Sequence, residues 1–132
     1  MKKLVLSLLF ISLLSCSGDS EIIPDNTSGD IHGVWKLNAE YNNGVRQGLS
    51  ECRLQENMAF EDNSIIMIKT DESSGANCSL STIQGTFSKA DNTLSIVFPN
   101  ENIKFKIKEL TTVKLVLIPE NSLKTFEYTK AK

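Results

Sequence analysis

The sequence has little of what catalytic and metal sites are usually built from. It contains one histidine, His32, one tryptophan and three cysteines. A zinc site needs several Cys or His ligands close together, and nucleophilic catalysis needs a base beside the nucleophile. His32 has neither kind of neighbour in the sequence, and we interpret it as an exposed loop residue. The G-x-S-x-G, G-x-x-x-x-G-K and H-E-x-x-H motifs are also absent. We therefore predict that the protein is not an enzyme and has no metal site or cofactor.

Long apolar runs and basic clusters are missing as well. The longest apolar stretch, Leu4–Leu14, is roughly half of the ~20 residues that a membrane-spanning helix needs. The chain has 16 acidic residues against 14 basic ones, without a block of Lys and Arg. Nucleic-acid binding relies on such basic patches, so we predict no nucleic-acid partner.

The first residues of the chain have the three parts of a secretory signal. Lys2 and Lys3 supply positive charge, Leu4–Leu14 is apolar, and Ser15 is small enough for a signal peptidase pocket. The residues Leu-Leu-Ser-Cys that end at Cys16 resemble the lipobox of bacterial lipoproteins, in which the cysteine is lipidated and becomes the mature N-terminus. An unpaired cysteine at the edge of an ordinary signal peptide is the alternative.

This resemblance divides the chain into three parts. Residues 1–15 are the predicted signal peptide, residues 16–30 the lipidated N-terminus and a flexible tether rich in Ser, Asp and Gly, and residues 31–132 one domain. Acyl chains on Cys16 would hold the protein on a membrane without crossing it. We expect it in the bacterial cell envelope, at the outer membrane, on the periplasmic or the surface-exposed face.

Two further cysteines, Cys52 and Cys78, lie in the predicted domain. An exported chain can keep a disulfide, and two thiols allow one pairing. We predict this disulfide, with two separate thiols as the alternative.

The rest of the chain shows the alternation of apolar and polar residues that marks short strands with one buried face. Apolar residues occupy every second position in three stretches: Trp35 to Tyr41, Ile103 to Ile107 and Val113 to Leu117. Two hairpins are predicted around turn-forming residues: Met58 to Glu61 with Ser64 to Thr70, and Ile83 to Ser88 with Thr93 to Phe98. Phe126 and Tyr128 end the series, and Arg53 to Asn57 is at best one helical turn.

About eight short sequential strands predict an all-β fold. We expect an up-and-down antiparallel β-barrel, because closure removes exposed strand edges. Two packed sheets are the alternative.

Several short motifs also suggest a family. They are Gly33-Val34-Trp35-Lys36-Leu37, Gly85-Thr86-Phe87, Asn92-Thr93-Leu94 and the stretch from Glu109 to Leu117. Their order and spacing, together with the positions of Cys52 and Cys78, resemble the small lipocalin-like domain of Bacteroidetes lipoproteins over about Ile31 to Lys130. The resemblance implies a lipocalin-like barrel in which Trp35 packs at the closed end, with ligand contact as the alternative role.

Two functions fit such a barrel, because eight strands leave room either for their own side chains or for one small ligand. The first is a membrane-anchored lipoprotein that binds a small hydrophobic or amphipathic ligand. Aromatic residues are the predicted lining: Trp35, Tyr41, Phe60, Phe87, Phe98 and Phe105. The second is a structural or interaction lipoprotein, an envelope component or inhibitor, with a filled barrel that binds an envelope protein through its surface.

Overall fold

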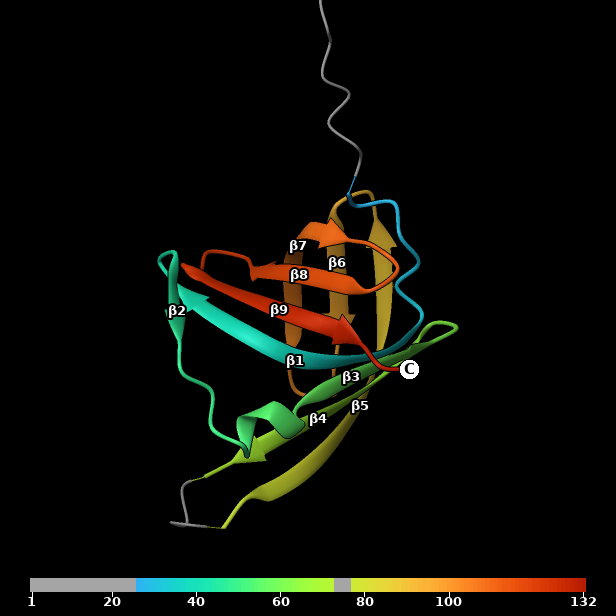
Figure 1. The fold of residues 1–132 in the computed structure, drawn as a ribbon. Coiled ribbons are helices and arrows are strands. Elements are labelled where there is room, and N and C mark those ends of the chain that lie inside the picture. The colour runs from blue at the N-terminus through green and yellow to red at the C-terminus, as the bar shows by residue number, and fades with distance from the viewer. Residues whose placement is uncertain (1–25, 73–76) are drawn as a thin grey trace, which may run out of the picture.

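In the computed structural model, which describes residues 26–72 and 77–132, the chain forms a closed antiparallel β-barrel (Figure 1). The sheet order is β2-β1-β3-β4-β5-β6-β7-β8-β9, and β1 also pairs with β9. This second pairing closes a ring of eight strands, so the predicted fold class is confirmed. The strands are β1 (Gly33–Asn42), β2 (Val45–Gln47), β3 (Asn57–Glu61), β4 (Ser64–Asp71), β5 (Ser79–Ala90), β6 (Thr93–Val97), β7 (Asn102–Leu110), β8 (Lys114–Pro119) and β9 (Lys124–Lys130).

Both predicted hairpins are confirmed as β3–β4 and β5–β6. Their turns include Asp62 and Asp91, which have positive φ angles of 50° and 52°, a conformation that Asp adopts more readily than most residues. The alternating stretches correspond to β1, β7 and β8. The predicted helical turn is a short 3-10 helix, η1 (Arg53–Gln55). The pattern did not predict β2, which extends β1 as a short hairpin outside the ring.

Two irregularities reverse the alternation of inward and outward side chains. The register of β1 against β9 shifts between Leu37 and Ala39, and that of β7 against β8 shifts between Ile107 and Glu109. An extra residue in one strand is a β-bulge, and beyond it the faces are exchanged. In β1 this places Glu40 opposite Phe126, facing the interior, and moves Tyr41 to the outside.

The barrel has a closed end and an open end. At the closed end the chain before β1 lies over the core, where Ile31 is buried and its carbonyl accepts a hydrogen bond of 2.7 Å from Trp35 Nε1. The Trp35 side chain is fully buried, and Lys130 Nζ lies 5.1 Å from its ring centroid. These contacts give Trp35 a packing role. At the open end the loop with η1 runs beside the mouth.

The long strand β5 pairs with two different strands along its length. Its first part pairs with β4 and its last part, from Thr86 to Ala90, with β6. Where the two pairings meet, a side chain on Gly85 would overlap the carbonyl of Val97 and approach Phe98 Cδ1 to 2.8 Å. Glycine is therefore required at this close approach.

The strand pairings, the hydrophobic core and the disulfide that the structure describes lie within residues 26–132. Each described strand of the barrel therefore has its partners within this part of the chain. The predicted signal peptide, Cys16 and most of the predicted tether lie outside the described residues. Among the described residues, no helix is long and apolar enough to span a membrane.

Candidate ligand cavity

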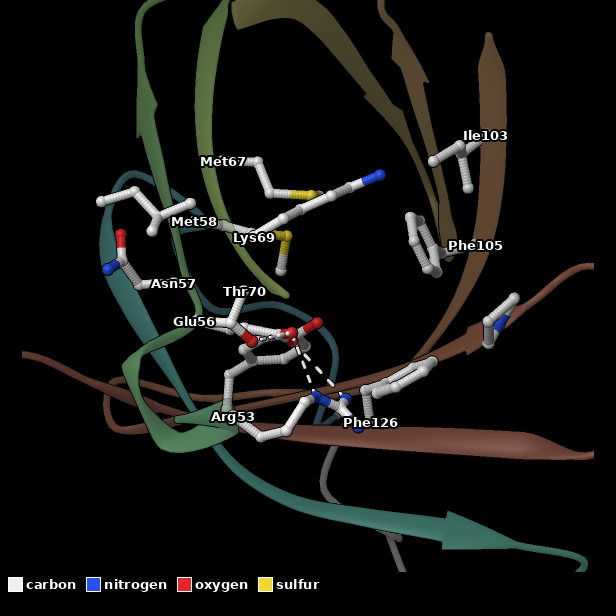
Figure 2. Close-up of a pocket in the computed structure, with 13 residues that line it drawn as sticks. Arg53, Glu56, Asn57, Met58, Met67, Lys69, Thr70, Ile103, Phe105 and Phe126 are labelled. Carbon is white, nitrogen blue, oxygen red and sulfur yellow. Dashed lines mark hydrogen bonds and ion pairs between the residues drawn. The ribbon is translucent and has the colours of Figure 1, made fainter. Parts of the chain in front are cut away.

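A cavity of about 320 Å³ lies at the open end of the barrel. Its residues come from η1 and the loop after it, from the strands β3, β4, β7 and β9, and from the last residue of β8. Figure 2 shows apolar side chains around it, with Met67 on one side and Ile103 and Phe105 on the other. The lining residues are Arg53, Glu56, Asn57, Met58, Met67, Ile68, Lys69, Thr70, Ile103, Phe105, Pro119, Phe126 and Tyr128. The volume is at the lower end of the ~300–1,000 Å³ that small-molecule sites occupy.

One side of the cavity is polar. Arg53 Nη1 lies 2.9 Å from Glu40 Oε2, and Arg53 Nε donates a hydrogen bond of 3.0 Å to Glu56 Oε1. The same Glu56 oxygen accepts a hydrogen bond of 2.8 Å from Thr70 Oγ1. Burial lowers the pKa of Arg53, but the carboxylates of Glu56 and Glu40 outweigh it, so that its pKa lies above the ordinary value. Arg53 therefore stays charged and holds η1 against the barrel wall.

Tyr128 is the inward-facing tyrosine of β9. Its side chain is 9% exposed and lines the cavity. Burial, and next the charge of Glu56, raise the pKa of its hydroxyl far above the ordinary value. The hydroxyl is therefore a neutral group at neutral pH.

The six predicted lining residues lie in four places. Phe105 lines the cavity. Trp35 belongs to the closed end, and Phe60 and Phe87 pack edge to face, with ring centroids 4.9 Å apart. The Phe87 ring also contacts the ring of His32, which precedes β1.

The remaining two residues that were predicted to line the cavity, Phe98 and Tyr41, lie elsewhere. Phe98 is buried in the core beside Gly85. The prediction that Tyr41 faces the interior was wrong, because the bulge in β1 turns Tyr41 outward. There it lies near Lys108, Lys114 and Glu127 in a hollow on the outer surface.

The cavity contains residues that the sequence reading missed. Met58, Met67 and Ile103 lie at alternating positions of predicted strands, so that strand pattern was a usable signal for them. Arg53 and Glu56 come from a loop, and nothing in their spacing shows that this loop folds against the mouth.

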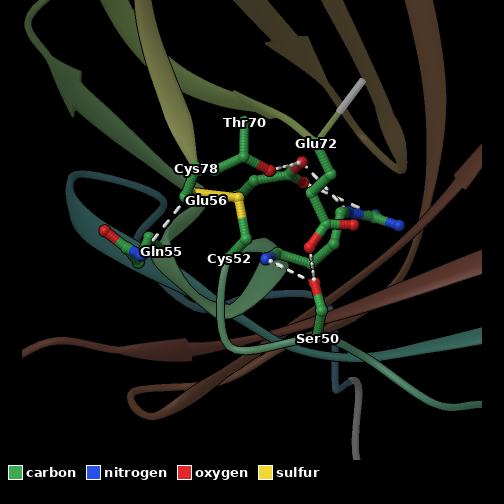
Figure 3. The surroundings of a disulfide bond; sticks show 8 residues. Ser50, Cys52, Gln55, Glu56, Thr70, Glu72 and Cys78 are labelled. Atoms are coloured by element: carbon green, nitrogen blue, oxygen red, sulfur yellow. Dashed lines mark hydrogen bonds and ion pairs between the residues drawn. A yellow bond between two sulfur atoms is a disulfide. The ribbon is translucent and has the colours of Figure 1, made fainter. Parts of the chain in front are cut away.

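The disulfide between Cys52 and Cys78 is confirmed, with Cα atoms 5.5 Å apart. Cys52 precedes η1 and Cys78 precedes β5, so the bond ties the loop beside the mouth to the barrel wall (Figure 3). Ser50 Oγ donates a hydrogen bond to Glu72 in the same region. The disulfide thus helps to position Arg53 and Glu56.

The side chains that line the cavity offer apolar contacts and hydrogen-bonding groups. Within residues 26–72 and 77–132, no three His, Cys, Asp or Glu side chains gather into a metal-binding group. His32 is exposed and contacts Asp30 and the carbonyl of Asp62 at the other end of the barrel.

Comparison with known proteins agrees with the barrel fold. The chain is similar in fold to a lipocalin-like protein from Bacteroides uniformis, with 20% identity, a TM-score of 0.61, and coverage of 78% of this chain and all of that one. It is likewise similar to an uncharacterized protein from Bacteroides eggerthii, with 19% identity, a TM-score of 0.59, and coverage of 77% and 100%. A search of curated proteins finds no match. The profile of the lipocalin-like domain matches residues 31–117, and the chain therefore belongs to the lipocalin-like domain family.

Proposed function

We propose that the protein is a membrane-anchored lipoprotein that binds one small hydrophobic or amphipathic ligand in the cavity at the open end of its barrel. The observation that carries this proposal is the cavity itself. Three of its walls are apolar side chains, from Met67, Phe105 and Phe126, and one side offers hydrogen-bonding groups. Few polar groups in a mostly apolar hollow are typical of sites that bind small molecules.

The alternative, an interaction lipoprotein with a filled barrel, requires an interior without free space. A hollow of about 320 Å³ inside the mouth favours the carrier. The proposal is one of binding and not of catalysis, since the charged residues at the cavity are held in ion pairs with one another.

The anchor gives this function its location. Lipidation at Cys16 would hold the barrel at a membrane without a segment that crosses it. In this proposal the protein works at the outer membrane of the bacterial envelope.

A binding measurement tests the carrier function. The chain from residue 17 to 132 lacks the anchor and keeps every contact of the barrel. We expect it to bind the neutral fluorophore N-phenyl-1-naphthylamine, excited directly, with saturation at one molecule per chain. Native mass spectrometry of the same preparation checks for a ligand that is retained during purification.

Two variants on one strand show where the fluorophore binds. Met67 faces the cavity from β4, and its neighbour Ile66 is 39% exposed on the outer face. Met67→Trp should fill the cavity and lower the affinity at least tenfold, whereas Ile66→Trp should leave it unchanged. Equal effects of the two variants, or no saturable binding by the folded wild type, would contradict the proposal.

A further inference from the structure

The cavity has two distinct sides, and their chemistry limits the ligand. Figure 2 shows Arg53, Glu56 and Thr70 together, away from Ile103 and Phe105. Tyr128 lines the same cavity from β9 and is only 9% exposed, so its hydroxyl is a further polar group of the site. A ligand that fills the cavity therefore meets apolar walls with its body and this polar side with one end.

The charges at the polar side are already balanced. Arg53 lies between two carboxylates, at 2.9 Å from Glu40 and 3.0 Å from Glu56. Glu40 has a second cationic partner, Lys124 Nζ, at 3.5 Å. An ionised group on the ligand would enter this arrangement without a free counter-charge, and leaving a charge unpaired in a partly buried site is costly.

The other charged residue of the cavity is also paired. Lys69 Nζ lies 3.3 Å from Glu101 Oε1, which belongs to the turn between β6 and β7. The cavity therefore offers neither a free cation for an acidic ligand nor a free carboxylate for a basic one.

The Tyr128 hydroxyl differs from these groups. No hydrogen bond joins it to another residue in 26–72 or 77–132, although Tyr128 is only 9% exposed. Yet no fully enclosed side-chain nitrogen or oxygen in these residues lacks a partner. The hydroxyl is therefore reachable from the cavity, and a buried tyrosine hydroxyl is normally hydrogen-bonded. This neutral group can donate one hydrogen bond and accept another.

We propose that the ligand is an uncharged amphiphile, with a compact apolar body and one neutral hydrogen-bonding group, such as an alcohol, a ketone or an ester, that binds the Tyr128 hydroxyl. This inference rests on the proposed function and adds the class of ligand to it. The apolar body lies against Met58, Met67 and Phe105, and the ion pairs of Arg53 stay intact.

The test compares compounds that share one medium-length alkyl chain and differ only at its end. A primary alcohol, the carboxylate, the ammonium and the plain alkane compete with N-phenyl-1-naphthylamine for the chain 17–132. We expect the alcohol to bind about tenfold more tightly than the carboxylate or the ammonium. Tyr128→Phe should weaken the alcohol about threefold to tenfold, the range for one hydrogen bond, and leave the alkane unchanged.

Tyr41→Phe is the matched control. It removes the same hydroxyl from the other tyrosine of the chain, which lies on the outer surface, and should change no affinity. A carboxylate or ammonium that binds better than the alcohol would overturn the inference and leave the carrier function standing. Alcohol binding that is insensitive to Tyr128→Phe would overturn the role of Tyr128. Failure of every compound and of the fluorophore would overturn the proposed function instead.

Discussion

Glu40 is an inward-facing charge that the barrel tolerates because two cations neutralise it. Its side chain is 8% exposed and contacts Arg53 at 2.9 Å and Lys124 at 3.5 Å. A buried carboxylate without partners would cost several kcal/mol, so the bulge that turns Glu40 inward and the loop that brings Arg53 depend on each other.

Neutralising Glu40 should destabilise the barrel. Glu40→Gln leaves Arg53 with one carboxylate and should lower the free energy of unfolding by about 1–3 kcal/mol, the range for a lost hydrogen bond to a charged group. Urea denaturation of the chain 17–132 measures the change. Glu61→Gln is the control, since Glu61 is exposed at the end of β3. Equal stability of the two variants would mean that Glu40 contributes nothing to folding.

At the closed end, His32 and Asp30 form a pair whose strength depends on pH. His32 Nδ1 lies 2.6 Å from Asp30 Oδ1. Hydrogen bonding to Asp30 raises the pKa of His32 above 6.5. The hydrogen bond from the His32 backbone N–H, followed by that from its side chain, lowers the pKa of Asp30 below 3.8. The folded state thus holds the His32 proton more tightly, and the Asp30 proton more weakly, than the unfolded chain.

The sign of the pH dependence follows from these two shifts. The contribution of His32 is complete below pH 6.5 and disappears as the pH rises through its higher folded pKa. The contribution of Asp30 is present above pH 3.8 and disappears as the pH falls through its lower folded pKa. We expect His32→Gln to lower the melting temperature slightly near pH 5.5 and not near pH 9. The effect should shrink in high salt because both groups are exposed. A difference that grows toward high pH would contradict this assignment.

Among the elements, the short helix η1 is held in place by the disulfide and not by contacts of its own buried side chains. It has three residues and contains no buried side chain. The bond from Cys52 to Cys78 and the contacts of Arg53 fix it beside the mouth. The disulfide therefore acts both on the stability of the barrel and on the polar side of the cavity.

Removing the disulfide should lower both the stability of the barrel and its affinity for the ligand. The double variant Cys52→Ser with Cys78→Ser frees a loop with a sequence separation of 26, and the chain-entropy relation gives roughly 3.5 kcal/mol for its closure. We expect that loss in urea denaturation, with circular dichroism of the native state unchanged, since the strand pairings do not involve either cysteine. Ligand affinity should also fall, whereas Met67→Trp weakens binding alone. An unchanged free energy of unfolding would contradict the prediction, because it would mean that removing the disulfide does not raise the conformational entropy of the unfolded chain.

The positions of the strands could be predicted from the sequence more reliably than which of their side chains face the interior of the barrel. Alternation located β1, β7 and β8, because the side-chain period of a strand is directly visible in polarity, and turn-forming residues located the hairpins β3–β4 and β5–β6. Alternation failed beyond Leu37, where one extra residue reverses the faces without changing the polarity pattern. This explains why Tyr41 was placed inside and Glu40 was not recognised as an interior residue.

The cavity was harder to predict for a similar reason. Aromatic residues were expected to line it, but Trp35, Phe60 and Phe87 fill the closed end instead. The polar side depends on contacts between Arg53, far from β9 in sequence, and the interior of the barrel. Such long-range contacts follow from closure of β1 on β9, which no local pattern encodes.

For the whole molecule, the described chain starts at the end of the barrel opposite the cavity. The N–H of Leu110 donates a hydrogen bond to the carbonyl of Asn26, and the Leu110 carbonyl accepts one of 2.9 Å from the N–H of Gly29. Leu110 ends β7 at the closed end, whereas Phe105, earlier in the same strand, lines the cavity. About ten residues separate Cys16 from Asn26, and they can span at most ~35 Å when fully extended. If Cys16 carries the anchor, we expect the closed end to lie nearer the bilayer than the mouth does.

Fluorophores at the two ends test this orientation in the anchored protein. Val113, 63% exposed in the turn after β7, marks the closed end, and Leu123, 70% exposed before β9, marks the open end. With each replaced by a labelled cysteine, we expect quenchers in the lipid of reconstituted vesicles to quench the Val113→Cys label more strongly. The same labels on the chain 17–132 should not be quenched, because that form lacks the anchor. Stronger quenching at Leu123→Cys would mean that the mouth faces the bilayer and receives its ligand directly from the membrane, whereas a mouth directed away can receive it from a second protein or from solution.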